Sequence, residues 1–256
     1  MTQRQVKAAV LLIGDEILSG RTQDVNLQAI AKFLAPLGVQ VAEVRVVADV
    51  PEDIVAGVNA LREKYDYVFT TGGIGPTHDD KTADAVALAF GVGIGVRDDA
   101  RAILEAHYKG ASNLNDSRLR MARIPDGASL IANPVSKAPG FQIGNVFVMA
   151  GVPSIVRGML NDIAHRIEGG AVVRSRTIRG KGVREGDIAA DLEALETEAG
   201  GAVSFGSYPW FAPPDSFGLH LVARSADPVA LEKAAYDLIT LIRARGVEPE
   251  EPVEPS

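Results

Sequence analysis

The first 90 residues alternate between short apolar runs and amphipathic stretches. Residues 6–13 form a continuous apolar run rich in branched side chains, which predicts a strand buried on both faces of a parallel sheet. Leu27, Ile30 and Leu34 then recur at helical spacing, and Gly38 follows where a helix end favours a left-handed residue. The same alternation predicts strands at residues 39–47 and 67–71, a helix beginning at Pro51 and a further helix over about residues 81–90.

Strands that alternate with helices predict a three-layer α/β/α domain, in which helices cover both faces of a mostly parallel sheet. A polar helical stretch, two further strands and a last helix complete this first domain, which we place at residues 1–168. The ranges expected for these elements are 98–123, 128–132, 141–149 and 153–167. In such a sheet, ligands bind at the carboxyl ends of the strands.

A second, smaller α/β domain is predicted at residues 171–246, after a glycine-containing linker at residues 168–170. Two helices are expected to cover one face of a three-stranded sheet, with strands at residues 172–178, 202–207 and 218–222 and helices at 185–198 and 228–245. Residues 247–256 are rich in Pro and Glu and have little apolar surface to bury, which predicts a disordered tail.

Composition narrows the class of partner. The formal net charge of the 256 residues is -7, with acidic and basic residues mixed along the chain. A nucleic-acid partner is therefore not expected, because duplex phosphates need many clustered cations. The absence of cysteine excludes thiolate metal sites and disulfides. The first apolar run is too short for a signal peptide or a membrane span, so we expect a cytoplasmic protein without a membrane partner.

A glycine-rich segment, residues 70–80, joins the third strand to the next helix. Gly72, Gly73 and Gly75 allow the backbone to approach a ligand closely, and the N–H groups of the following helix start attract phosphate. The spacing alone is equally consistent with a plain strand-to-helix turn. The segment is not a P-loop, because no Gly-Lys-Ser/Thr closes it.

Carboxylates follow the ends of three predicted strands. Asp15 and Glu16 follow the first, Asp49 the second, and Asp79 and Asp80 end the glycine-rich segment. Hard oxygen ligands of this kind suit magnesium or a similar divalent metal that bridges to phosphate. The alternative is that several of them only cap helices, Asp49 above all because a helix begins at Pro51.

Another helix start, after Gly151 and Pro153, places Ser154 where it can face a bound anion or simply cap the helix. With the residues of the glycine-rich segment, the candidate ligand-binding residues are Gly72, Gly73, Gly75, Thr77, Lys81, Gly151, Pro153 and Ser154.

An aromatic group at residues 208–211, which includes the one tryptophan, is expected in a turn between two strands of the small domain. It can stack a base, form a subunit contact or pack between the two domains.

Residues 70–85, with Gly-Gly-x-Gly-Pro-Thr-x-Asp-Asp-x-Thr, resemble the signature of the molybdenum-cofactor biosynthesis (MoaB/Mog) domain, which binds molybdopterin. Residues 14–26, the Asn-Pro to Gly-Phe loop at 133–141 and the Gly-Val-Pro-Ser turn at 151–154 resemble further motifs of one branch of this family. That branch contains competence/damage-inducible protein A (CinA) and the N-terminal domain of FAD synthases. Residues 207–209 are similar to a turn in the small domain of the same branch.

The resemblance implies a three-layer α/β fold with molybdopterin or a nucleotide as a small-molecule ligand at the strand ends. It makes Asp80 the match to the catalytic aspartate of the family and Asp49 the match to a second acidic position. It also implies a homo-oligomer, a dimer or trimer. Asp15 departs from the pattern, because many relatives have threonine there, and the sequence stops after the small domain, without the amidohydrolase or synthase domain of longer relatives.

Three functions follow from this resemblance. Members of the wider family adenylylate molybdopterin, whereas the branch resembled here includes proteins that hydrolyse the pyrophosphate of ADP-ribose or FAD with a divalent metal. Metal-dependent hydrolysis of a nucleotide pyrophosphate is our leading hypothesis, with Asp80 and Asp49 as catalytic residues and Asp79, Asp80, Asp15 and Glu16 as metal ligands. Adenylyl transfer to molybdopterin is the second hypothesis, and a non-catalytic pterin- or nucleotide-binding module is the third.

Overall fold

The computed structural model describes residues 4–251 of the chain. These residues divide into two compact units, with the boundary between Ala171 and Val172. Within them, no helix combines the length and the apolar character that a membrane crossing requires.

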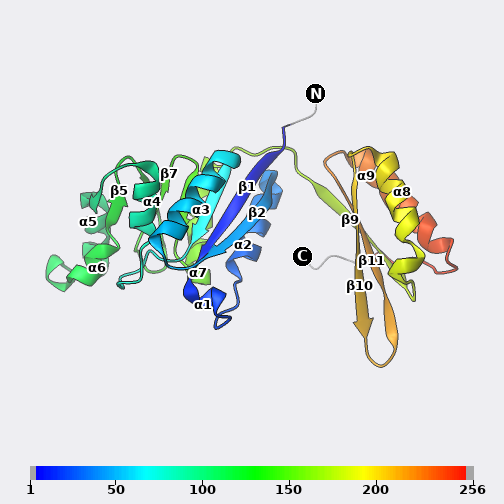
Figure 1. The fold of residues 1–256 in the computed structure, drawn as a ribbon, viewed down its shortest axis with the longest axis horizontal. Coiled ribbons are helices and arrows are strands. Elements are labelled where there is room, and N and C mark those ends of the chain that lie inside the picture. The colour runs from blue at the N-terminus through cyan, green and yellow to red at the C-terminus, as the bar shows by residue number, and fades with distance from the viewer. Residues whose placement is uncertain (1–3, 252–256) are drawn as a thin grey trace. The chain divides into compact units, whose positions relative to one another are not determined.

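The first unit is built on a six-stranded sheet in the order β2-β1-β3-β8-β7-β6 (Figure 1). Strands β2, β1, β3 and β8 run parallel, whereas β7 and β6 are antiparallel to their neighbours, so the predicted mostly parallel sheet is confirmed. Its strands are β1 (Val6–Ile13), β2 (Val39–Val47), β3 (Tyr67–Thr71), β6 (Ser129–Ile131), β7 (Gly140–Ile143) and β8 (Val146–Met149); β4 (Ile94–Val96) and β5 (Arg123–Pro125) form a separate ladder.

Helices cover both faces of this sheet, because strand β1 is apolar on both sides. Leu11 packs with Ile54 in one core, and its neighbour Val10 packs with Ile30 in the other. The alternation of successive side chains between the two faces of a strand produces these two cores. Helices α3 (Pro51–Lys64), α4 (Thr82–Phe90) and α5 (Asp98–His107) line the first core, and α2 (Asn26–Leu34) and α7 (Pro153–Ile163) line the second.

Two predicted elements of the first unit are wrong in detail. The helical stretch at residues 98–123 is interrupted after α5, and a separate helix α6 (Asp116–Arg120) begins where the Asn115 side chain accepts a hydrogen bond from the Arg118 amide. The single strand expected at residues 141–149 is the hairpin β7–β8. Gly144, with φ of 53°, makes the tight turn that a continuous strand excludes.

The second unit is a three-stranded antiparallel sheet in the order β10-β11-β9, with two helices on one face. Leu219 and Leu221 of the sheet pack against Leu238 and Ile242 of the last helix in one apolar core. The elements are β9 (Arg174–Lys181), α8 (Ala189–Ala199), β10 (Ser204–Ala212), β11 (Ser216–Ser225) and α9 (Pro228–Arg243). The smaller α/β domain expected from the sequence is confirmed.

Two expectations for the second unit are corrected. The aromatic residues 208–211 lie inside strand β10 and pair with β11, so they do not form the turn. Residues 247–251 also have contacts, because Glu250 and Arg179 exchange both backbone hydrogen bonds, at 2.7 and 2.9 Å. This pairing with β9 and the packing of Val247 on the core hold the segment, so the predicted disordered tail does not begin at residue 247. The rest of that tail, residues 252–256, lies outside the described residues.

Candidate functional site

The carboxyl ends of three parallel strands meet closely at one edge of the first unit's sheet. The Gly72 amide after β3 donates to the carbonyl of Met149 in β8, at 3.2 Å. A Cβ added to Gly72, whose φ is 102°, would lie 2.1 Å from the carbonyl oxygen of Ile13 in β1. A Cβ on Gly151 would come 3.4 Å from the Gly72 Cα. Glycine at position 72 therefore lets three strand ends pack together, and it brings the predicted motifs side by side.

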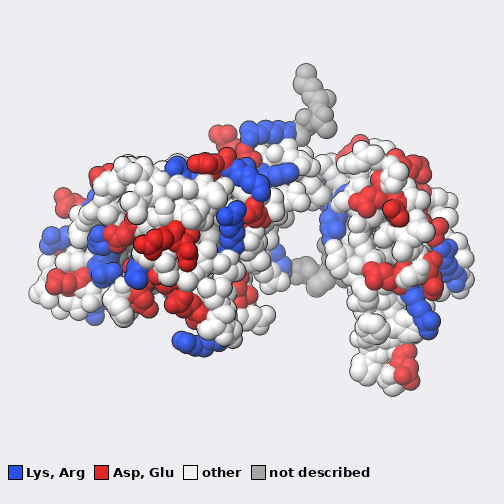
Figure 2. Space-filling model, viewed as in Figure 1, with Lys and Arg blue, Asp and Glu red and all other residues white. Residues whose placement is uncertain are grey.

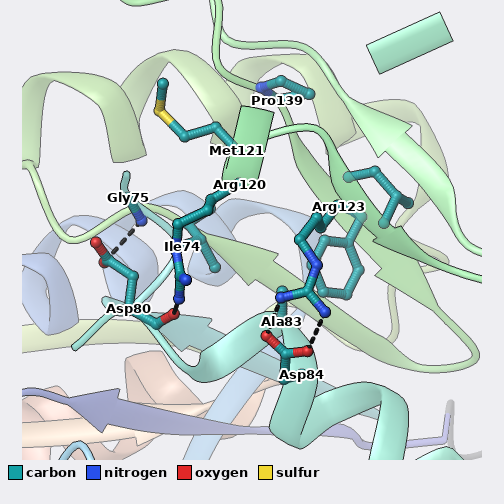
Figure 3. Close-up of a pocket in the computed structure, with 12 residues that line it drawn as sticks. Ile74, Gly75, Asp80, Ala83, Asp84, Arg120, Met121, Arg123 and Pro139 are labelled. Carbon is teal, nitrogen blue, oxygen red and sulfur yellow. Dashed lines mark hydrogen bonds and ion pairs between the residues drawn. The ribbon is translucent and has the colours of Figure 1, made fainter. Parts of the chain in front are cut away.

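The glycine-rich segment folds around the side chain of Asp80. The Gly75 amide donates to Oδ1 of Asp80 at 2.7 Å (Figure 3). The amide and hydroxyl of Thr77 both donate to Oδ2, at 2.8 and 2.5 Å. A carboxylate that accepts several N–H and O–H groups fixes a loop conformation. Gly75 and Thr77, two of the predicted ligand-binding residues, thus donate their amides to the chain's own carboxylate.

The helix that follows this segment begins without a side-chain cap. Helix α4 has Lys81 at its N-cap, and no side chain of the described residues accepts a hydrogen bond there, so Asp79 and Asp80 are not capping residues. Helix α7 likewise has no side-chain cap, and Ser154 is an exposed residue in its first turn. Both alternatives that assigned these residues to capping are wrong. Several first-turn amides already have acceptors, because Thr82 donates to the Gly73 carbonyl and both Ile155 and Val156 donate to the Val152 carbonyl. The amides of Ala83, Asp84 and Ser154 have no acceptor among the described residues and keep their capacity to bind an anion.

Four carboxylates surround the end of strand β2, and we call Asp15, Glu16, Asp49 and Asp79 the acidic group. Asp49 does not cap α3; its Oδ2 accepts the Asp15 amide at 3.0 Å. Burial raises the pKa of Asp49, the hydrogen bond from Asp15 lowers it, and the negative charges of Asp15, Glu16 and Asp79 raise it further, so that the net shift is upward. The Thr77 hydroxyl lowers the pKa of the exposed Asp79. The first and second strand ends and the glycine-rich segment thus concentrate negative charge in one place.

A small hollow of about 60 Å³ lies beside these strand ends. Its lining includes Glu16, Asp24, Asn26, Thr71, Gly151 and Pro153. Asn26 is buried and donates to the Gly151 carbonyl at 2.7 Å, while its Oδ1 is buried without a hydrogen-bond partner among the described residues. A buried acceptor of this kind is costly unless something donates to it. From the sequence, Asn26 was included only as the last residue of the motif at residues 14–26 and was not assigned to the site.

A second hollow, shown in Figure 3, lies between the glycine-rich segment and strand β5. Its volume of about 20 Å³ suits a single water molecule rather than a phosphate group. Arg123 is paired with Asp84 through both of its terminal nitrogens, at 2.6 and 2.8 Å. Arg120 donates to the Asp80 carbonyl at 3.4 Å and so helps to hold the end of the glycine-rich segment in place.

The fit of these residues to a divalent metal is partial. Within residues 4–251, no group of three or more His, Cys, Asp or Glu side chains is arranged to enclose a metal ion. Magnesium at phosphate sites usually takes one or two carboxylates and completes its shell with water and phosphate oxygens, so an all-protein cage is not required. The acidic group meets that smaller requirement, and an added cation would relieve the repulsion that raises the pKa of Asp49.

The fold and this edge define an α/β protein of the class that binds small molecules at the carboxyl ends of parallel strands. Residues 9–168 match the family described as "Probable molybdopterin binding domain", and residues 173–251 match "FAD synthase, middle domain". The chain belongs to the molybdopterin-binding-domain (MoaB/Mog) family, in its CinA-like branch, as the sequence motifs indicated.

Individual relatives agree with this assignment. The chain is 35% identical to a CinA-like protein of Gemmatimonas aurantiaca over 73% of its length and 46% of the relative, and 31% identical to a CinA-like protein of Frankia casuarinae over 93% and 58%. It therefore spans about half the length of these curated relatives. The crystal structure of "the protein CinA with unknown function" from Thermoplasma acidophilum is similar over 62% of this chain and 96% of that one, with 35% identity and a TM-score of 0.59.

Proposed function

We propose that the chain hydrolyses the pyrophosphate of a nucleotide of the ADP-ribose or FAD type, with a divalent metal held by Asp15, Glu16 and Asp79 of the acidic group together with Asp80. The observation that carries the proposal is the concentration of Asp15, Glu16, Asp49 and Asp79 beside two helix starts without side-chain caps. A site that combines anion-binding amides with excess carboxylate charge suits a ligand that is itself a metal–phosphate complex.

The phosphates are assigned to the first-turn amides that have no acceptor among the described residues, those of Ala83 and Asp84 in α4 and of Ser154 in α7. Both helices begin at the edge where β3 and β8 end, and neither start is occupied by a side-chain acceptor. The amides of Gly75 and Thr77 are not assigned to phosphate, because Asp80 accepts from them. A polar N–H or O–H group of the ligand is assigned to the unpaired Oδ1 of Asn26, which lines the strand-end hollow.

Asp49 and Asp80 have different roles in this proposal. A bound metal supplies positive charge that stabilises the phosphorus centre and the leaving phosphate. Burial, the largest cause of the upward shift, raises the pKa of Asp49 and makes it a stronger base than an exposed aspartate, and Asp49 accepts a proton from the attacking water. The water oxygen bonds to one phosphorus, the bridging P–O bond breaks, and two monophosphates form. Asp80 keeps Asp79 and the first turn of α4 in position through its loop contacts, and its remaining lone pairs are available to the metal.

The proposal is tested with the purified chain, magnesium or cobalt, and ADP-ribose, FAD, or ATP with molybdopterin. Asp49→Asn removes the basic carboxylate and keeps its size, and Asp53→Asn is the matched control, because Asp53 is an exposed carboxylate on helix α3. We expect AMP release from ADP-ribose or FAD by the wild type and the control. Asp49→Asn should lower the rate at least about 100-fold, beyond the 10- to 100-fold typical of an outer-shell partner.

Other outcomes separate the competing functions. Adenylylated pterin formed from ATP, with no AMP released from ADP-ribose or FAD, would contradict hydrolysis in favour of adenylyl transfer. Tight pterin binding without turnover of any substrate would contradict both enzymatic functions. Equal rates of AMP release in Asp49→Asn and Asp53→Asn would show that Asp49 takes no part in the hydrolysis.

A further inference from the structure

A larger hollow lies in the second unit, at the free end of the hairpin formed by β10 and β11, and we call it the hairpin hollow. Its volume is about 420 Å³, compared with about 60 and 20 Å³ for the two hollows of the first unit. Small-molecule sites commonly enclose about 300–1,000 Å³ and are mostly apolar with a few polar groups. The lining is Val183, Arg184, Glu185, Pro209, Phe211, Phe217, Gly218 and Leu219.

The floor of the hairpin hollow continues the core face of the sheet beyond the helices. Leu219, buried in the second unit's core, pairs across the strands with Pro209, and the next pair on the same face is Phe211 with Phe217. The hairpin reaches past the ends of α8 and α9 (Figure 1), and the pair of Phe211 with Phe217 is the second to last of its ladder. Phe211 is consequently 83% exposed. Figure 2 shows that the end of the hairpin is mostly uncharged on the face in view, with acidic atoms at its tip.

One rim of the hairpin hollow carries a donor and an acceptor from adjacent residues. The guanidinium of Arg184 lies 5.7 Å from the centre of the Phe217 ring, and it can still donate into the hollow. The carboxylate of Glu185 is held by the hydroxyl of Ser207 on β10 and has further lone pairs. A ligand with an acceptor next to a donor on one edge would complement Arg184 and Glu185.

We infer that the hairpin hollow binds a planar heteroaromatic ring with a neighbouring C=O and N–H on one edge. The ring stacks on the exposed ring of Phe211, its C=O accepts from Arg184, which lies over Phe217, and its N–H donates to Glu185. Exposed aromatic faces favour stacked rings, and the polar rim selects the ring edge. The inference goes beyond the proposed hydrolysis and does not depend on it, because no residue of the strand-end site lines this hollow.

The test uses the full chain and riboflavin, whose ring has an N–H flanked by two C=O groups. Binding is followed by the polarisation of riboflavin emission. Phe211→Ala removes an exposed ring without disturbing a core, and Tyr236→Ala removes an exposed ring from α9 as the matched control. We expect saturable binding that Phe211→Ala weakens about 5- to 150-fold, from the ~1–3 kcal/mol of a base–aromatic stack, and that Tyr236→Ala leaves unchanged.

A ligand variant tests the polar rim. In 3-methylriboflavin the ring N–H is blocked, so it should bind the wild type more weakly than riboflavin, and Glu185→Gln should reduce that difference between the two ligands.

The inference is overturned if riboflavin shows no saturable binding, or if Phe211→Ala binds as tightly as Tyr236→Ala. A doubling of mass in the wild type that Phe211→Ala abolishes would also overturn it, because a second copy would then occupy the hollow. Pyrophosphate hydrolysis is measured separately, and Asp49→Asn should leave riboflavin binding unchanged.

Discussion

The strand-end site and the hairpin hollow differ in volume and in charge. The first unit's site is crowded and charged, with three further carboxylates around that of Asp49 and a hollow of about 60 Å³. The hairpin hollow has about 420 Å³ and an aromatic floor, with one cation and one carboxylate on its rim. Chemistry requires the dense polar arrangement, whereas ring recognition requires uncovered apolar area. The first unit therefore has the charged groups that a reaction needs, and the second unit has the volume that a ring needs. The substitutions below test whether the structure of each unit depends on the contacts described.

The largest expected effect comes from Gly72, where the strand ends pack. Gly72→Ala places a Cβ 2.1 Å from the Ile13 carbonyl in a left-handed conformation, so the strands must separate. We expect the free energy of unfolding of the first unit to fall by about 3 kcal/mol or more. Gly91→Ala is the control, because Gly91 is also left-handed but has open space around it, and it should cost about 1 kcal/mol. Urea unfolding followed by circular dichroism measures both; equal losses would show that the close packing at Gly72 is unimportant.

The next effect concerns the loop that Asp80 holds. Asp80→Ala removes the acceptor of three hydrogen bonds from Gly75 and Thr77, and we expect faster amide hydrogen exchange at both residues and a loss of about 1–2 kcal/mol. Asp80→Asn keeps one carbonyl acceptor and should fall between the wild type and Asp80→Ala. Unchanged exchange at Gly75 in Asp80→Ala would mean that the loop conformation does not depend on this carboxylate.

A smaller effect is expected in the second unit, at the start of α9. The Asp227 side chain accepts hydrogen bonds from the amides of Val229 and Ala230. Asp227→Ala should therefore destabilise the second unit by about 1 kcal/mol. Trp210 emission during urea unfolding reports this unit, and hydrogen exchange at Gly75 should stay as in the wild type. A change at Gly75 would contradict the independence of the two sites.

The smallest effect is a pH dependence at the edge strand β2. Hydrogen bonds from Lys64, Tyr65 and Arg45 lower the pKa of Glu43 from its ordinary 4.5 to about 2. Because the folded-state pKa is the lower one, the stabilisation is complete above about pH 4.5 and is lost as the pH falls towards 2. The stability difference between wild type and Glu43→Gln should shrink over that window, as measured by thermal unfolding at several pH values. A difference that stays constant below pH 4.5 would exclude this linkage.

Much of the first unit was predictable from the sequence, because its strands and helices are encoded locally. The run at residues 6–13 is apolar on both faces, and the structure buries it between two cores. The acidic residues at the ends of β1 and β2 do meet, since parallel strands that end together bring their following residues together.

What the sequence did not predict depends on contacts made far along the chain or on loop conformation. In the glycine-rich segment, Asp80 accepts from the Gly75 amide, which was expected to face phosphate. This contact depends on the dihedral angles of the loop, which the sequence does not give. Asn26 became a site residue only through its contact with Gly151, 125 positions away. The pattern of aromatics at residues 208–211 resembled a turn because Pro209 is unusual in a strand, yet β10 is an edge strand, where proline is tolerated.

The pairing of Glu250 with Arg179 also bears on how the second unit avoids aggregation. An exposed edge strand is a template for pairing with other chains, and this sheet has two edges, β9 and β10. On β9, the last described residues pair with the backbone, and Glu250 and Glu251 bond to the side chains of Arg179 and Arg176. On β10, Pro209 removes a backbone donor. Each edge thus carries its own obstacle to intermolecular strand pairing, so the aromatic end of the hairpin can stay uncovered without the sheet extending into a second chain.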